Sequence, residues 1–553
     1  MKYTNVVYVL LAWLISAQPL AEARNISYDD NFGPLYKNLP FNMPMVALPK
    51  IPRYEVSIEK FGGVGDGVSV NTGAFAKAIN HLSEKGGGRL IVPRGIWLSG
   101  PIVLKSHIDL HVQSGALVKF IPDKDLYELI DTSYEGLNAW RPISPIYANN
   151  LTDIAITGQG TIDGSGGDWR LVKKSKMTDG QWKKLVASGG IVSDDGKVWF
   201  PSQESLQGAK AMKTDNIFKY NKKQAQAIKH WLRPVMVALV NTDRILLDGP
   251  TFQNSPAWNL HLLMSQNIVV RNVQVRNPWF AQNGDGIDLE SVKNVLVYKN
   301  RFDVGDDAIC LKSGKNEDGR RRGIPSENLI IQDNVVYHGH GGFVLGSEMS
   351  GGVKNVSFSK ATFIGTDIGI RFKSTRGRGG VVENIWISDI DMIDIAKGAI
   401  NFNLYYSNKV LWEPGKKNKD DVPPVDEKTP QFKDISIKNV RALNVGIAAF
   451  LQGLPEMKLR NVTLENAYFE SNKGIQITDA DNINFNNVTV LSQQQNAIDL
   501  RNASNVNFGD IDIGKEHHVS IQGEESNDIV FDKKGLKIKM GEYVNEEAVR
   551  YSQ

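Results

Sequence analysis

Cysteine is almost absent from this chain of 553 residues, which contains only Cys310. A single cysteine cannot form an intrachain disulfide, and a secreted eukaryotic protein of this size usually carries several. The composition therefore excludes a disulfide-stapled scaffold, and for an exported protein it favours a bacterial origin. We expect Cys310 to be a small, buried apolar residue.

Net charge and long apolar runs are also scarce. Lysine and arginine number 64 against 61 aspartates and glutamates, which leaves a formal charge of +3. So small a charge gives no strong steering toward polyanions, so we expect no nucleic-acid partner, and local cations must recognise any acidic substrate. Beyond the N-terminal segment no stretch approaches the 18 apolar residues of a transmembrane helix, so no membrane span is expected.

The N-terminal segment has the pattern of an export signal. Lys2 precedes an apolar run over residues 6–17, and Ala21-Glu22-Ala23 forms a small-x-small cleavage site. This pattern is typical of a secretory signal peptide, although a buried N-terminal helix is the competing interpretation. We predict a signal peptide over residues 1–23, an extension over 24–50 and one catalytic domain over 51–553. The mature protein is expected to be a periplasmic or secreted monomer.

An internal repeat of about two dozen residues organises the rest of the chain. Each copy is an Asn followed by alternating apolar residues, as in "NIVVRNVQVRN" at Asn267, "NVLVYKNRFDV" at Asn294 and "NINFNNVTVLS" at Asn482. Period-2 alternation predicts strands with one buried face, and units this short leave no room for helical crossovers. Stacked units of this kind predict an all-β fold, a right-handed parallel β-helix. A β-propeller is the competing fold, but its blades need about 40–45 residues.

Three features depart from the repeat. An amphipathic helix near Thr72–Glu84 is expected to cap the open N-terminal end of the solenoid, since terminal repeats must be atypical. Two insertions, at residues 165–233 and 405–428, break the strand pattern and are predicted to form loops near the binding face. The recurrent asparagines are interpreted as a structural ladder, because Asn tolerates a left-handed backbone and bonds its neighbours.

Acidic residues gather in the stretch "NGDGIDLESVKNVLVYKNRFDVGDDAICLKSG". Asp285 follows one repeat, and Asp306 and Asp307 follow the next at nearly the same phase. His340 comes at the phase of Asp306 one repeat later, so we expect all four side chains on one outer face. Carboxyl groups held close together acquire different pKa values, which gives a protonated acid beside an ionised base. That pairing is suited to glycoside hydrolysis.

Two cations follow on the next repeat. Arg371 and Lys373 alternate around Phe372, so period-2 geometry directs both cations to the outer face and Phe372 into the core. We interpret the pair as a site for a substrate carboxylate. Taken singly, each aspartate could be a turn residue, His340 a satisfied turn histidine and the cations a solvated strand face. Their appearance on four consecutive repeats favours a site.

These residues resemble the signatures of one family. "NGDGID", "GDDAI", "GHGG" and "RFK" are similar, in order and spacing, to the four motifs of the polygalacturonases, glycoside hydrolase family 28, and "NSPAWNLH" resembles the segment before them. The resemblance implies a right-handed parallel β-helix and inverting hydrolysis of α-galacturonides in pectic polysaccharides or oligogalacturonides. It implies neither metal nor cofactor. This chain departs from the family motifs at two positions: Gly284 stands where the family often has Thr, and Ala308 stands where it commonly has Cys.

The resemblance also implies roles for individual residues. Asp306 would be the general acid, Asp285 and Asp307 would activate water, and His340 would support protonation of the acid. Arg371 and Lys373 would bind the galacturonate carboxylate. The remaining candidate substrate contacts are His261, Asn283, Gly341 and Tyr405. An inverting pair also predicts a carboxyl separation of roughly 6.5–9.5 Å between Asp306 and Asp285.

The mode of attack is predicted from the insertions. Residues 165–233 precede the catalytic repeats and residues 405–428 follow them, so together they could close one end of a groove and make the enzyme exo-acting. Trp169, Trp182 and Trp199, with Lys173 and Lys174, are suited to holding a terminal uronate. Decorative loops or a dimer contact are the alternative.

Other classes of function remain open at this stage. A pectate lyase would use the same carboxylates to bind Ca²⁺. An adhesin or phage fibre would share the β-helix without catalysis, and a rhamnogalacturonan fragment is an alternative substrate.

Overall fold

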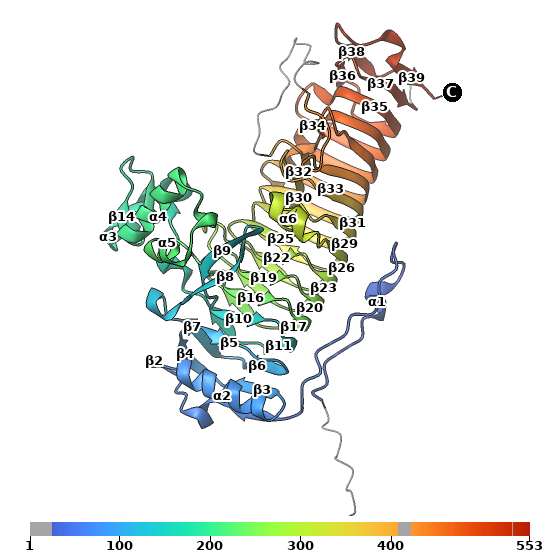
Figure 1. The fold of residues 1–553 in the computed structure, drawn as a ribbon. Coiled ribbons are helices and arrows are strands. Elements are labelled where there is room, and N and C mark those ends of the chain that lie inside the picture. The colour runs from blue at the N-terminus through green and yellow to red at the C-terminus, as the bar shows by residue number, and fades with distance from the viewer. Residues whose placement is uncertain (1–24, 407–421, 533–534, 553) are drawn as a thin grey trace, which may run out of the picture.

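Parallel strands stacked in successive coils form the body of the protein in the computed structural model, which describes residues 25–406, 422–532 and 535–552. One sheet system of 34 strands runs from the N-terminal to the C-terminal end of the coils, as Figure 1 shows. This is the predicted right-handed parallel β-helix. The signal peptide predicted over residues 1–23 lies outside the described residues.

Each central coil contributes three short strands, and each strand pairs in parallel with its counterpart on the next coil. Two consecutive coils are β19 (Leu260–Leu263), β20 (Gln266–Arg271) and β21 (Gln274–Arg276), then β22 (Ile287–Glu290), β23 (Lys293–Tyr298) and β24 (Arg301–Asp303). The next coil comprises β25 (Asp307–Lys312), β26 (Ser326–Gln332) and β27 (Val335–Val336).

Period-2 alternation divides each strand between the core and the outer face. In β22, Ile287 and Leu289 are fully buried in the central apolar core, while Asp288 and Glu290 have the opposite orientation. Ile287 is in register with Leu260 before it and Ile309 after it, so like residues stack along the core. The outer face of the same strands is therefore free to carry polar chemistry.

The asparagine ladder is present as predicted. Asn328 Nδ2 donates to Asn294 Oδ1 at 3.1 Å, and Asn355 Nδ2 donates to Asn328 Oδ1 at 3.2 Å. Each of these residues has a positive φ between 55° and 61°, the left-handed region that Asn tolerates. The ladder fixes the turn at the same place in every coil, which holds neighbouring coils in register.

The predicted capping helix is α2 (Thr72–Glu84), at the N-terminal end of the coils in Figure 1. Its buried face consists of Ala74, Phe75, Ala78, Ile79 and Leu82, and these side chains join the central core. The helix thus covers apolar groups that another coil would otherwise bury.

The extension before the coils is an ordered arm, which the sequence did not reveal. It contains the short helix α1 (Gly33–Tyr36) and packs along the outside of the coils (Figure 1). Phe32, Val46 and Ile51 are buried against a row of apolar side chains that includes Leu246 and Leu296. The arm therefore covers an apolar stripe on the outer surface.

Truncating Phe32 tests this role of the arm. Phe32 is 2 % exposed, so we expect Phe32→Ala to lower the free energy of unfolding by about 3–5 kcal/mol. Thermal unfolding of purified variants measures the effect. Met45→Ala is the matched control, because Met45 lies in the same arm and is 55 % exposed. Equal melting temperatures for both variants would show that the arm does not stabilise the coils.

The insertion at residues 165–233 forms a small subdomain beside the coils, drawn in green in Figure 1. It consists of α3 (Asp179–Ala187), α4 (Gln203–Thr214), α5 (Lys222–Ala227) and an antiparallel sheet of β13 (Val172–Lys173), β15 (Val198–Phe200) and β14 (Ile191–Val192). An antiparallel hairpin of β8 (Leu129–Tyr134) and β9 (Leu137–Pro142), which the sequence analysis missed, packs against α5.

The insertion at 405–428 is described only at its two ends, because residues 407–421 lie outside the described part of the chain. No helix among the described residues is long and apolar enough to cross a bilayer.

Candidate active site

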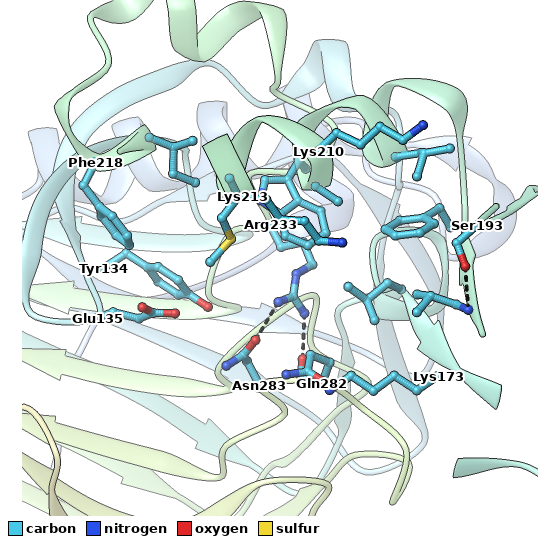
Figure 2. A pocket seen from close by; sticks show the side chains of 18 of the residues that line it. Tyr134, Glu135, Lys173, Ser193, Lys210, Lys213, Phe218, Arg233, Gln282 and Asn283 are labelled. Carbon is cyan, nitrogen blue, oxygen red and sulfur yellow. Dashed lines mark hydrogen bonds between the residues drawn. The ribbon is translucent and has the colours of Figure 1, made fainter. Parts of the chain in front are cut away.

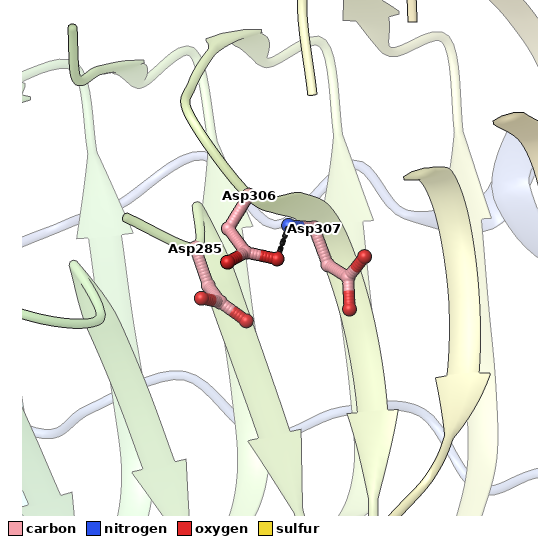
Figure 3. A group of neighbouring side chains, drawn as sticks. All are labelled: Asp285, Asp306 and Asp307. Atoms are coloured by element: carbon pink, nitrogen blue, oxygen red, sulfur yellow. Dashed lines mark hydrogen bonds between the residues drawn. The ribbon is translucent and has the colours of Figure 1, made fainter. Parts of the chain in front are cut away.

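Three aspartates meet where β22 and β25 begin (Figure 3). The amide of Gly286 donates to the carbonyl of Asp307 at 2.9 Å, which aligns the two coils. One carboxylate oxygen from each of Asp285, Asp306 and Asp307 lies within 4.8 Å of the others. The structure thus brings together the three carboxylates that the sequence analysis placed on one face.

The closest approach of these carboxylates is a different quantity from the spacing that was predicted. One oxygen of Asp285 lies within 4.8 Å of one oxygen of Asp306. The roughly 6.5–9.5 Å predicted for an inverting pair refers to the separation of the two carboxyl groups, which is larger than the distance between their nearest oxygens. The predicted separation therefore stays a prediction.

Two cations neutralise Asp307. Lys373 Nζ lies 2.6 Å from Asp307 Oδ2, and Arg371 Nη1 lies 3.3 Å from Asp307 Oδ1. Both come from β30 (Ile368–Lys373), and Phe372 between them is fully buried, as the alternation predicted. Burial opposes ionisation of Asp307, but Lys373 and Arg371 outweigh it and hold its pKa well below the usual range.

The other two aspartates have the opposite character. Burial and the neighbouring Asp307 raise the pKa of Asp306. Burial, then Asp288 and Asp306, raise the pKa of Asp285 well above its ordinary value. The site therefore places carboxyl groups whose pKa is raised beside one whose pKa is lowered, which is the asymmetry that general acid–base catalysis requires.

His340 immediately precedes β28 (Gly341–Gly346), and its amide donates to the carbonyl of Asp306 at 2.9 Å. Its Nδ1 lies 2.6 Å from Asp367 Oδ2, and Lys397 Nζ lies 2.9 Å from the same oxygen. The Asp367 carboxylate orients the imidazole of His340. Sequence reasoning missed Asp367, although it lies one coil after His340, just before the "RFK" motif.

Two predicted substrate contacts are engaged within the protein. His261 is 1 % exposed and its Nε2 lies 2.9 Å from Glu290 Oε2, so this nitrogen already has a partner. Tyr405 is 5 % exposed and belongs to the central core. The exposed ring is that of Tyr406, which lies 5.1 Å from Lys373 Nζ and 5.5 Å from the Arg371 guanidinium carbon.

The remaining two predicted substrate contacts, Asn283 and Gly341, shape the surroundings of the aspartates. Asn283 Oδ1 accepts a hydrogen bond from Arg233 Nη2 at 2.7 Å, which ties the insertion to the loop before Asp285. At Gly341 a side chain has no space, because a Cβ would lie 2.4 Å from Val344 Cγ2 and 3.3 Å from Asp307 Oδ1. Gly341 thus keeps the surroundings of the Asp307 carboxylate clear.

A cavity of about 630 Å³ lies between the insertion and the loop that carries Gln282 and Asn283, which precede Asp285 in the chain (Figure 2). Apolar side chains such as Phe200 and Trp231 form much of its wall, and Lys173 and Lys213 line it as well. The lining of the cavity comes from both the insertion and the catalytic coils.

The tryptophans of the insertion do not serve as predicted. Trp169, Trp182 and Trp199 are 1 %, 9 % and 7 % exposed. Trp182 and Trp199 pack together in a small apolar cluster of the subdomain, whereas Trp169 packs against Tyr127 and Ile143 outside it. They are not available to stack on a sugar.

Within the described part of the chain, one group of carboxylates comes close enough to surround a cation, and it consists of Asp285, Asp306 and Asp307. Both oxygens of Asp307 already contact Lys373 or Arg371. The protein's own cations therefore take the place beside Asp307 that a metal ion would need.

A carboxyl whose pKa is raised beside one whose pKa is lowered, on the outer face of a β-helix, fits the acid–base pair of a glycoside hydrolase. Residues 174–429 match the glycosyl hydrolases family 28. A "Probable polygalacturonase" of Vitis vinifera is 30% identical over 75% of this chain and 74% of its own length. An endo-polygalacturonase of Pectobacterium carotovorum subsp. carotovorum is 27% identical over 74% of this chain and 86% of its own.

Among solved structures, the hyperthermoactive exopolygalacturonase from Thermotoga maritima is 33% identical, with a TM-score of 0.65, over 80% of this chain and 93% of that one. The chain belongs to glycosyl hydrolases family 28, and it is a hydrolase of the polygalacturonase type. Nothing in these comparisons supports the lyase alternative.

Proposed function

We propose that this enzyme cleaves α-galacturonide bonds of polygalacturonate or oligogalacturonides by acid–base catalysis. Asp306 donates a proton to the leaving oxygen, and Asp285 and Asp307 orient the attacking water. The observation that carries the proposal is the opposite perturbation of two adjacent carboxyls, with the pKa raised at Asp306 and lowered at Asp307. Arg371 and Lys373 beside them supply the charge that a uronate carboxylate needs.

Substrate class is tested by product analysis. Polygalacturonate and a rhamnogalacturonan backbone are incubated separately, and new reducing ends are measured together with absorbance near 235 nm. We expect reducing ends from polygalacturonate without absorbance, because hydrolysis leaves no double bond. Exclusive cleavage of rhamnogalacturonan would move the assignment to that polymer, and an absorbing product would overturn hydrolysis.

We also propose that hydrolysis inverts the anomeric centre. The proposal rests on the resemblance of the motifs and on two carboxyl sources for one water, Asp285 and Asp307, which leaves Asp306 as the acid. Proton NMR during the first minutes of oligogalacturonide cleavage decides the point, since inversion of an α bond releases the β-anomer first. Initial release of the α-anomer would instead mean a covalent intermediate on one of the aspartates.

Exo action is the third part of the proposal. The cavity beside Asn283 has the insertion as one wall, so a chain end fits there better than the middle of a polymer. One relative is described as an exopolygalacturonase and another as an endo-polygalacturonase, so the cavity carries the argument. The export predicted from residues 1–23 remains part of the same proposal, since an extracellular polymer must be reached.

Viscosity distinguishes the two modes of attack. We expect polygalacturonate viscosity to fall slowly while galacturonic acid or short products accumulate steadily. Excising residues 173–202, which removes one wall of the cavity, should shift the enzyme toward internal cleavage and a faster viscosity loss for each bond cut. An intact enzyme that collapses the viscosity early would show that the groove is open at both ends.

A further inference from the structure

A buried lysine lies among the acidic groups of the site without a role in the scheme above. Lys312, at the end of β25, is 3 % exposed. Its Nζ lies 3.2 Å from Glu348 Oε2 and 3.5 Å from Asp288 Oδ1. The same nitrogen lies 4.8 Å from the ring centre of Trp258, so one wall of its surroundings is aromatic. An ammonium group so enclosed needs neighbouring anions to remain charged.

Asp288 is the more unusual partner. Its carboxylate is fully buried, and neither oxygen accepts a hydrogen bond within the part of the chain that the structure describes. Lys312 is the cation with which it forms an ion pair. A buried carboxylate without hydrogen bonds is costly, and burial raises the pKa of Asp288 well above its ordinary value. The Lys312 ammonium is the largest influence that opposes this shift and favours the charged form.

The two residues flank the catalytic carboxylates through strand register. Asp288 on β22 is in register with Cys310 on β25. Lys312 lies two residues after Cys310, at the end of the strand that begins with Asp307. The titratable and charged groups that face Lys312 come from β22, β25, β28 and β30, and from the segments that flank these strands. They are Asp285, Asp288, Glu290, Asp306, Asp307, Cys310, Glu348 and Lys373. Acidic groups are in excess, so the ammonium is a central part of the charge balance.

We propose that Lys312 is a positioning residue that, through its ion pair with Asp288, favours the ionised form of the Asp285 carboxylate, the form that activates water. This inference rests on the proposed function. Without the pair, an uncompensated negative charge three residues away in the chain would favour a proton on Asp285. Burial is the largest cause of the raised pKa of Asp285 and Asp288 adds to it, whereas Lys312 opposes both.

A purely structural ion pair would give a different result from a charge-setting one. Removing one partner of a buried pair destabilises the fold in either case. Only a charge-setting pair shifts the pH at which the base loses its proton, and it shifts that pH in opposite directions for the two partners.

The experiment is therefore the pH profile of kcat/KM on a short oligogalacturonide, whose acid limb reports the base of the free enzyme. For Lys312→Met we expect the acid limb to move up by about one pH unit, because a cation near Asp285 is lost. For Asp288→Asn we expect it to move down, because an anion is lost. In the variant that carries both substitutions, the pH of the acid limb should return toward its wild-type value.

Controls separate this inference from a loss of fold or of function. Lys312→Arg retains the charge and should keep the wild-type acid limb, and melting temperatures report stability independently. The inference is overturned if the acid limb of the kcat/KM profile stays at its wild-type pH in folded Lys312→Met and Asp288→Asn. If Lys312→Met does not fold, Asp288→Asn decides alone, and an unchanged acid limb in that variant rejects the inference. A wild-type enzyme without activity on any galacturonide would instead reject the proposed function.

Discussion

Replacing Asp306 with asparagine should reduce kcat on polygalacturonate by a factor on the order of 10³ while leaving the fold intact. An amide cannot supply the proton that the leaving oxygen needs. The replacement keeps the local structure, because the Asp307 amide donates to Asp306 Oδ1 at 3.1 Å and asparagine offers the same acceptor. Initial rates of reducing-end release and a melting curve of the same preparation measure the two effects.

Asp303→Asn is the matched control for this prediction. Asp303 lies on the preceding strand β24, is part of the same coil as Asp306, and bonds the exposed His338 at 2.8 Å. It belongs to no part of the proposed mechanism, so its rate should stay near that of the wild type. If Asp306→Asn retained activity comparable to Asp303→Asn, Asp306 would not be the acid.

The repeat made much of this geometry predictable from the sequence. Asn294 and Asn328 mark the same turn in consecutive coils, so equal distances along the chain from them give equal positions in space. That is why Asp306 and His340, at the same phase, meet through a backbone hydrogen bond. Alternation also placed Arg371 and Lys373 on one face, because strand geometry leaves no other arrangement.

Several contacts that the sequence analysis missed concern side chains outside the regular strands. Tyr405 and Tyr406 follow a strand, and a neighbouring pair can exchange its buried and exposed members without disturbing any sequence pattern. The partner of His340 is Asp367, one coil away, and no spacing rule for strands specifies such a contact. The arm around Phe32 packs on coils far along the chain, and local sequence contains no signal for that contact.

The distances between the carboxylate oxygens could not be predicted from the sequence either. Register places Asp285 beside Asp307, but the distance between carboxyl oxygens depends on side-chain torsions and on neighbouring charges. Lys373 and Arg371 bind Asp307 from the far coil, while no cation forms an ion pair with Asp285 within the described residues. The charged groups of the site thus span four coils, and the two cations that pair with Asp307 come from the last of them.

Lys373→Met should lower kcat/KM on oligogalacturonides by about 10²–10³-fold, through both kcat and KM. Lys373 Nζ is buried against Asp307 Oδ2, and truncating one partner of a buried charge pair costs about 2–5 kcal/mol. Losing the ammonium raises the pKa of Asp307, so kcat falls most at acidic pH; losing a cation for the substrate carboxylate raises KM.

The control for this last prediction is Lys354→Met, since Lys354 is an exposed strand lysine paired with Glu327 and lies outside the site. Arg371 remains in Lys373→Met, so residual carboxylate binding is expected and a measurable KM should survive. The decisive comparison is the pH profile of kcat. A cation that served the substrate alone would raise KM and leave that profile unchanged, and Lys373 would then have no part in keeping Asp307 ionised.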